Sequence, residues 1–110
     1  MQFVHNVLGT PYLVKIGDEV EIDKDYVGMC KIYAKEILVN TKAENYTEEE
    51  LRVKVGEIVA HEIFHAYLNE AGLQLEEETE ELLADFYMKN WRKMSNSIFK
   101  VLDEANFLVE

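Results

Sequence analysis

The chain has 110 residues, 48% of them hydrophobic, which suits one globular domain with a modest core. Its 22 acidic and 11 basic residues give a net charge of −11, and with no basic face in view we expect no nucleic-acid binding. One cysteine excludes an internal disulfide. No apolar run approaches the roughly 20 residues that span a bilayer, and the first residues lack a signal-peptide pattern, so we expect a cytoplasmic protein without membrane contact.

Short strands are predicted in the first part of the chain. Residues 12–16 are apolar and rich in β-formers, Gly17-Asp18 is a turn signal, and residues 20–22 alternate between apolar and polar. Residues 32–33 and 37–39 are further short candidates.

A long helix is predicted from Thr47 to Gly72. Thr47 and Glu50 form a capping box, and acidic residues in the first turn suit the positive end of the helix dipole. Gly72 is a natural C-cap. Between these ends, apolar residues recur mostly three and four apart, as in a helix packed on a core: Leu51, Val55, Ile58, Val59, Ile63, Phe64 and Leu68.

The second half of this helix carries the HExxH sequence His61-Glu62-Ile63-Phe64-His65. Positions i and i+4 share one helical face, so both imidazoles can bind one metal ion. Glu62 lies beside them and can reach a water at the metal, which is the arrangement of zinc hydrolases. The sequence therefore predicts a Zn²⁺ site with His61 and His65 as ligands and Glu62 as the catalytic base.

A catalytic zinc usually has a third protein ligand. His5 and Cys30 have no motif around them, and we expect them to be an ordinary strand or surface residue and an ordinary core residue. The third ligand is then a downstream carboxylate.

A second long helix, predicted from about Glu77, narrows the choice. Apolar residues on most sides of the turn around Glu81 predict that this turn is buried, where a carboxylate needs a partner. We expect Glu81 on the metal and Asp85, four residues later on the same face, hydrogen-bonded to a ligand histidine. Glu77, one turn earlier, is the alternative ligand. The run of residues 76–80 is predicted to be a solvated helix start.

These elements predict a single α+β domain over residues 1–110, with a small twisted sheet of three or four strands packed on two long helices. By analogy with metallopeptidases of this general build, residues 36–40 are a candidate edge strand that could pair with an extended peptide.

The sequence His61-Glu-Ile-Phe-His65-Ala followed by Glu81-Leu-Leu-Ala-Asp85-Phe resembles the small HExxH metallopeptidase-like proteins of phages and prophages. More distantly it is similar to ImmA/IrrE-type metallopeptidases and other gluzincins. The resemblance extends over roughly residues 10–100 in layout, and residues 28–40 look like the strand pair before the active helix. It implies a minimal zincin-like fold, zinc on His61, His65 and Glu81, catalysis by Glu62, a phage- or prophage-encoded protein in a bacterial host cell, and a regulatory protein as a conceivable substrate.

Two main hypotheses follow for the function. The first is a zinc metallopeptidase that hydrolyses a peptide bond in a protein or peptide substrate. The second is an inactive zinc-containing module that docks on a partner protein through its acidic surface. Glu62 favours the first, because a structural metal site needs no base. A third hypothesis, that the protein mimics DNA, is supported only by its negative net charge.

Overall fold

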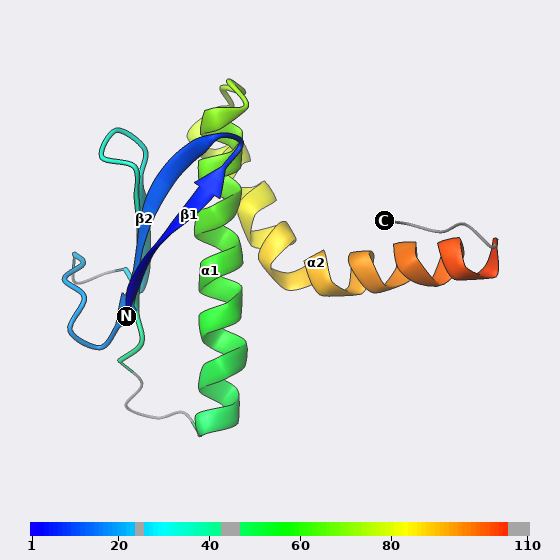
Figure 1. Ribbon diagram of the computed structural model, residues 1–110, viewed down its shortest axis with the longest axis horizontal. Helices are drawn as coiled ribbons and strands as arrows, with labels where there is room; N and C mark the ends of the chain where they lie inside the picture. The colour runs from blue at the N-terminus through cyan, green and yellow to red at the C-terminus, as the bar shows by residue number, and fades with distance from the viewer. Residues whose placement is uncertain (24–25, 43–46, 106–110) are drawn as a thin grey trace.

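The computed structural model describes residues 1–23, 26–42 and 47–105. Four strands form one mixed sheet and two helices follow, which confirms the predicted α+β class (Figure 1). The elements in chain order are β1 (Gln2–Val7), β2 (Thr10–Gly17), β3 (Gly28–Lys31), β4 (Glu36–Asn40), α1 (Glu48–Glu70) and α2 (Glu77–Glu104).

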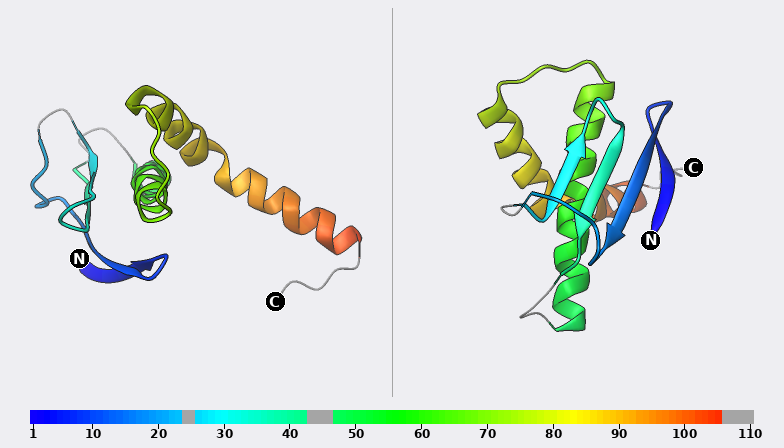
Figure 2. Two further views of the ribbon diagram at one scale, coloured as in Figure 1. Left: turned by 90° about the horizontal axis from the view of Figure 1, so that it is seen from above. Right: turned by 90° about the vertical axis from the view of Figure 1, so that its left-hand side faces the viewer.

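The strand order in the sheet is β1-β2-β4-β3. β1 and β3 pair antiparallel with β2 and β4 respectively, and the central pair β2–β4 is parallel. The prediction that residues 36–40 form an edge strand is wrong, because β4 lies between β2 and β3. The exposed edge near the start of α2 belongs to β3 (Figure 2, right).

Two strands predicted from sequence patterns are wrong, and the patterns do not predict β1 or β3, although the resemblance over residues 28–40 does imply the strand pair β3 and β4. Residues 20–22 form no strand, although the Val20 carbonyl accepts a hydrogen bond from Asn40 Nδ2 at 2.9 Å. Residues 32–33 lie in the turn between β3 and β4, where Lys35 takes a positive φ of 57°. β1 was not predicted as a strand because it buries only Val7, so its sequence carries no alternating pattern.

The core lies between one face of the sheet and α1. Its members are apolar residues from β1, β2, β4 and α1: Val7, Tyr12, Val14, Ile37, Val39, Ile58 and Ala66. α2 packs on α1 instead of on the sheet, so the layers are sheet, α1 and α2 (Figure 2, left). The predicted packing of both helices on the sheet therefore holds for α1 alone.

Both ends of α1 follow the prediction. Thr47 is the N-cap, and its hydroxyl accepts a hydrogen bond from the Glu50 amide at 3.1 Å. At the other end Ala71 is the C-cap and Gly72 takes the left-handed conformation with φ 73°. The bonds from Leu73 N to Leu68 O and from Gly72 N to Asn69 O complete a Schellman motif, which turns the chain toward α2.

Of the helices in the described residues, none is long and apolar enough to cross a membrane.

Candidate metal centre

His61 and His65 lie one turn apart on α1, on the side that α2 approaches, and their Nε2 atoms are 3.2 Å apart. Both side chains are mostly buried, with 15% and 13% of their surface exposed. The HExxH spacing therefore gives two imidazoles that converge on one point.

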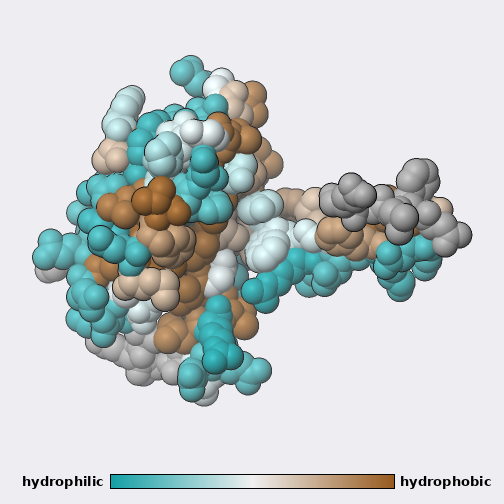
Figure 3. Space-filling model, viewed as in Figure 1, coloured by the Kyte–Doolittle hydropathy of each residue, from teal (hydrophilic) through white to brown (hydrophobic). Residues whose placement is uncertain are grey.

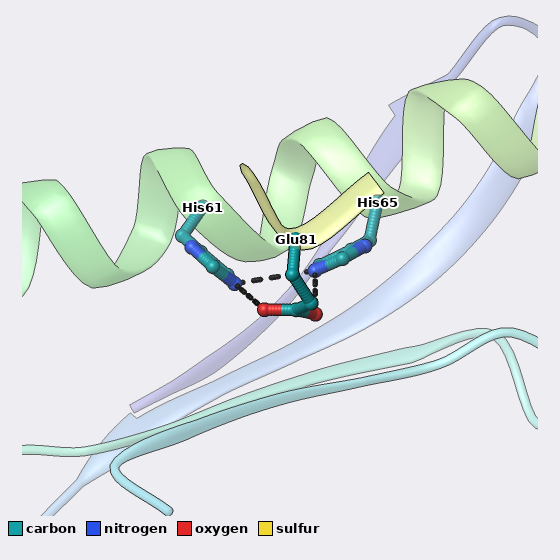
Figure 4. A group of neighbouring side chains, drawn as sticks. All are labelled: His61, His65 and Glu81. Carbon is teal, nitrogen blue, oxygen red and sulfur yellow. Dashed lines mark hydrogen bonds and ion pairs between the residues drawn. The ribbon is translucent and has the colours of Figure 1, made fainter. Parts of the chain in front are cut away.

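The first turn and a half of α2 brings Glu81 to that point. Glu81 Oε2 lies 3.3 Å from His61 Nε2, and Glu81 Oε1 lies 2.9 Å from His65 Nε2 (Figure 4). One ligand atom from each of the three residues falls within 4.8 Å of the others. The two histidines are contacted by different oxygens of the Glu81 carboxylate, and the three side chains form a group that could hold a metal ion.

Two further carboxylates contact the Nδ1 atoms of the histidines. Asp85 Oδ1 lies 3.1 Å from His61 Nδ1, and Glu80 Oε2 contacts His65 Nδ1. A metal bound at Nε2 requires the ring proton on Nδ1, where Asp85 and Glu80 are placed to accept a hydrogen bond from it. With this tautomer both Nε2 lone pairs would face the Glu81 carboxylate, and a cation would stabilise the electron-rich group.

Glu81 and Asp85 occupy the places that the helical register gave them. Glu77 is exposed and does not belong to the converging group found among the described residues. Glu80 was missed, because it was assigned to the solvated start of the helix. The motif does indicate a second acceptor, since each of two ligand histidines needs its own and Asp85 can serve only one, but it does not indicate which carboxylate supplies it.

The predicted burial of the turn around Glu81 is wrong. The Glu81 side chain is 53% exposed, and Leu82 and Phe86 are 70% and 55% exposed. In α2 only Ala84 is buried, because the helix rests on α1 along a narrow face and no other helix or strand of the described residues covers its remaining sides.

Glu62 is almost fully buried, with 8% of its surface exposed. β3 passes so close that a Cβ atom on Gly28 would lie 2.8 Å from Glu62 Oε2. Burial raises the pKa of the Glu62 carboxyl to about 7, nearby Glu81 adds to the rise, and His65 opposes it. A pKa near neutral suits a group that takes up and returns a proton, and a cation bound by the histidines would lower it again.

A cavity of about 220 Å³ opens beside Glu62 and His61. Gly28, Asp85 and Met88 are among its lining residues, so β3, α1 and α2 all contribute to it. A small molecule or side chain that enters this cavity can therefore reach the buried Glu62 carboxylate.

His5 and Cys30 lie outside the converging group. Cys30 lies on β3, where burial, and to a lesser extent Glu62 and Glu80, raise the pKa of its thiol to about 12. The thiol therefore stays protonated at neutral pH, whereas a metal ligand is a thiolate. His5 lies exposed on β1, in the strand at the opposite edge of the sheet from β3.

No protein family, curated protein or solved structure matches this chain.

Proposed function

We propose that this protein is a zinc-dependent metallopeptidase that hydrolyses a peptide bond in a protein substrate. One observation carries the proposal. The Nε2 atoms of two histidines and a carboxylate lie 2.9–3.3 Å apart, next to a buried glutamate that is not one of the three.

His61, His65 and Glu81 would hold the zinc, with Asp85 and Glu80 orienting the two rings. When bound, the metal supplies a Lewis acid that acidifies a water and polarises the scissile carbonyl. Glu62 would take a proton from the water as the water oxygen adds to the carbonyl carbon, and would give that proton to the amine nitrogen as the C–N bond breaks. Its burial beside Ile58 keeps bulk water from competing for its proton.

The outer edge of β3 supports a peptide as the substrate. The Asn40 amide donates to the Val27 carbonyl, so residue 27 and every second residue after it bond to β4. The backbone groups of Gly28 and Cys30 therefore point to the free edge, where an extended peptide can add as a further strand. Because Gly28 also touches Glu62, such a peptide would run past the metal centre.

The test separates metal binding from catalysis. We expect about one zinc per purified chain, loss of that zinc in the His61→Ala/His65→Ala double variant, and full zinc content in Glu62→Gln. Gln has the shape of Glu but cannot accept the proton, so Glu62→Gln should lose hydrolysis of a denatured-protein or peptide-library substrate.

Glu49→Gln is the matched control, because Glu49 is an exposed glutamate in the first turn of the same helix. Its zinc content and hydrolysis should equal those of the unaltered protein. If Glu62→Gln keeps its zinc and its full effect in cells, the proposal is overturned in favour of a module that docks on a partner protein.

A further inference from the structure

α2 carries an apolar seam that is longer than its contact with α1. The seam residues recur at alternating intervals of three and four, which is the spacing by which one helix packs along another. This defines the seam: Ala84, Tyr87, Trp91, Met94, Ile98, Val101 and Ala105.

The first half of the seam has a partner within the chain. Ala84 is fully buried against α1, and the Tyr87 ring lies 5.4 Å from the ring of Phe64. The same face of α2 therefore already acts as a helix-packing surface.

The second half of the seam has no covering element among the described residues. Met94, Ile98 and Val101 are 48%, 56% and 63% exposed, and the neighbouring Phe99 is 55% exposed. Residues 91–104, here called the arm, project away from the sheet and α1 (Figure 1). Apolar surface follows one side of the arm and polar surface the other (Figure 3).

The charges of the arm differ from those of the rest of the chain. Four of the 11 basic residues of the chain lie between Lys89 and Lys100, a stretch without any acidic residue. Asp103 and Glu104 follow at the end of α2. In an antiparallel pair, Asp103 of each copy lies level with Lys89 of the other and about one turn from Arg92, although Lys100 lies level with Arg92. Parallel arms would place all the like charges level with one another.

We propose that the arm pairs antiparallel with the arm of a second copy of this chain. The pairing is two-fold symmetric, with the seam positions Trp91 and Val101 of one copy opposite Val101 and Trp91 of the other. It covers the exposed half of the seam. The rest of each chain, outside the arm, is strongly acidic. Antiparallel pairing places these two acidic parts at opposite ends of the helix pair, where they repel each other least. The proposal does not depend on the metal centre.

The first test is the oligomeric state in sedimentation equilibrium. The seam of the arm spans only about two heptads, so we expect a monomer–dimer equilibrium over roughly the micromolar range. Ile98→Glu places a charge in the seam and should weaken dimerisation by at least roughly 100-fold. Asn96→Glu introduces the same charge on the opposite face of the arm and should leave the equilibrium unchanged.

Helical circular dichroism and zinc content show whether Ile98→Glu keeps its fold. The proposal is overturned if the unaltered protein stays monomeric up to high micromolar concentration. It is also overturned if the arm binds to anionic lipid vesicles as a monomer, which co-sedimentation with such vesicles would show. It is equally overturned if both variants dimerise alike.

The second test is the direction of the arms, in a Cys30→Ser background. A mixture of Trp91→Cys and Val101→Cys chains should form a disulfide between unlike chains, and each variant alone should form little. In an antiparallel pair, position 91 of one chain lies about 15 Å along the axis from position 91 of the other. Efficient disulfide formation within each single variant indicates parallel arms and overturns the proposal.

Discussion

At the scale of single residues, the two carboxylates that contact the Nδ1 atoms of the histidines can each be tested by mutation. Asp85 contacts the Nδ1 atom of His61, and Glu80 contacts the Nδ1 atom of His65. We expect Asp85→Asn and Glu80→Gln each to lower zinc affinity by about 10–100-fold, because either amide can hold its ring only with weaker, uncharged hydrogen bonding.

The measurement is competition for zinc against a chelator of known affinity. Glu78→Gln is the control, because Glu78 lies exposed in the same turn of α2 and should leave the affinity unchanged. A Glu80→Gln variant that binds zinc as tightly as Glu78→Gln would contradict the contact between Glu80 and His65.

Helical geometry predicts those parts of the candidate site that lie within a single helix. The four-residue spacings of His61 to His65 and of Glu81 to Asp85 each place two groups on one face of a helix, whatever the rest of the fold does. The role of Glu80 depends on how α2 crosses α1, which no spacing within α2 encodes. The contact of Gly28 with Glu62 likewise joins two elements that are far apart in the sequence.

At the scale of elements, the end of α1 is tied to the sheet through Glu70. Its carboxylate accepts hydrogen bonds from Tyr12 at 2.6 Å and from Lys35 at 2.8 Å. Lys35 and, after it, Thr10 and Tyr12 lower the pKa of the Glu70 carboxyl to about 2. The network joins α1 to β2 and to the turn before β4.

This pKa sets a pH dependence of stability. Because the folded pKa lies below the usual value, the stabilisation is present above about pH 5 and is lost as the pH falls toward 2. Glu70→Gln has no such charge, so the variant should be less stable at pH 7, and the difference in urea midpoint should shrink with acidity. A difference that stays constant from pH 7 to pH 2 would contradict this prediction.

A second prediction at this scale concerns the close passage of β3 over α1. A Cβ atom on Gly28 would lie 2.5 Å from Ile58 Cγ2 and 2.8 Å from Glu62 Oε2. Gly28→Ala must push β3 away from α1, so we expect a loss of about 1–3 kcal/mol in the free energy of unfolding, together with reduced hydrolysis.

Urea unfolding measures the change in stability. Gly17→Ala is the control, since the nearest atom to its added Cβ lies 3.4 Å away on the Glu19 side chain. We expect Gly17→Ala to lower the free energy of unfolding only slightly. Equal stability of the two variants would show that β3 is not held as closely as the structure has it.

The strands show where prediction from the sequence stops. β2 and β4 are predicted because their sequences are apolar stretches. In the structure both strands contribute buried residues to the core. β3 has four residues, Gly-Met-Cys-Lys, and is a strand because β4 offers it hydrogen bonds. Residues 20–22 alternate as a strand should, but they have no neighbouring strand to pair with. Whether β3 and residues 20–22 form strands depends on pairing with segments far away in the sequence. Such pairing leaves no pattern in the local sequence.

At the scale of the whole molecule, the chain is less compact than its length allows. Its radius of gyration is 15.6 Å, against about 13 Å for a compact domain of this size. The excess follows from α2, which rests on α1 over its first half and then extends beyond it (Figure 1). The position of α2 therefore depends mainly on its contact with α1, and the side chains of the candidate metal centre are part of that contact.

Removal of the metal should consequently loosen α2 before it affects the sheet. A cation bound by His61, His65 and Glu81 would link α1 to α2, and its removal breaks this link. Zinc at a thousand times its dissociation constant stabilises the folded state by about 4 kcal/mol, so chelation should lower the Tm by roughly 10 °C or more. Amide hydrogen exchange should rise in residues 77–91 and stay slow in β2 and β4, whose partners are strands and the buried face of α1. An unchanged Tm, with equal exchange in α2 before and after chelation, would show that the ion does not hold the two helices together.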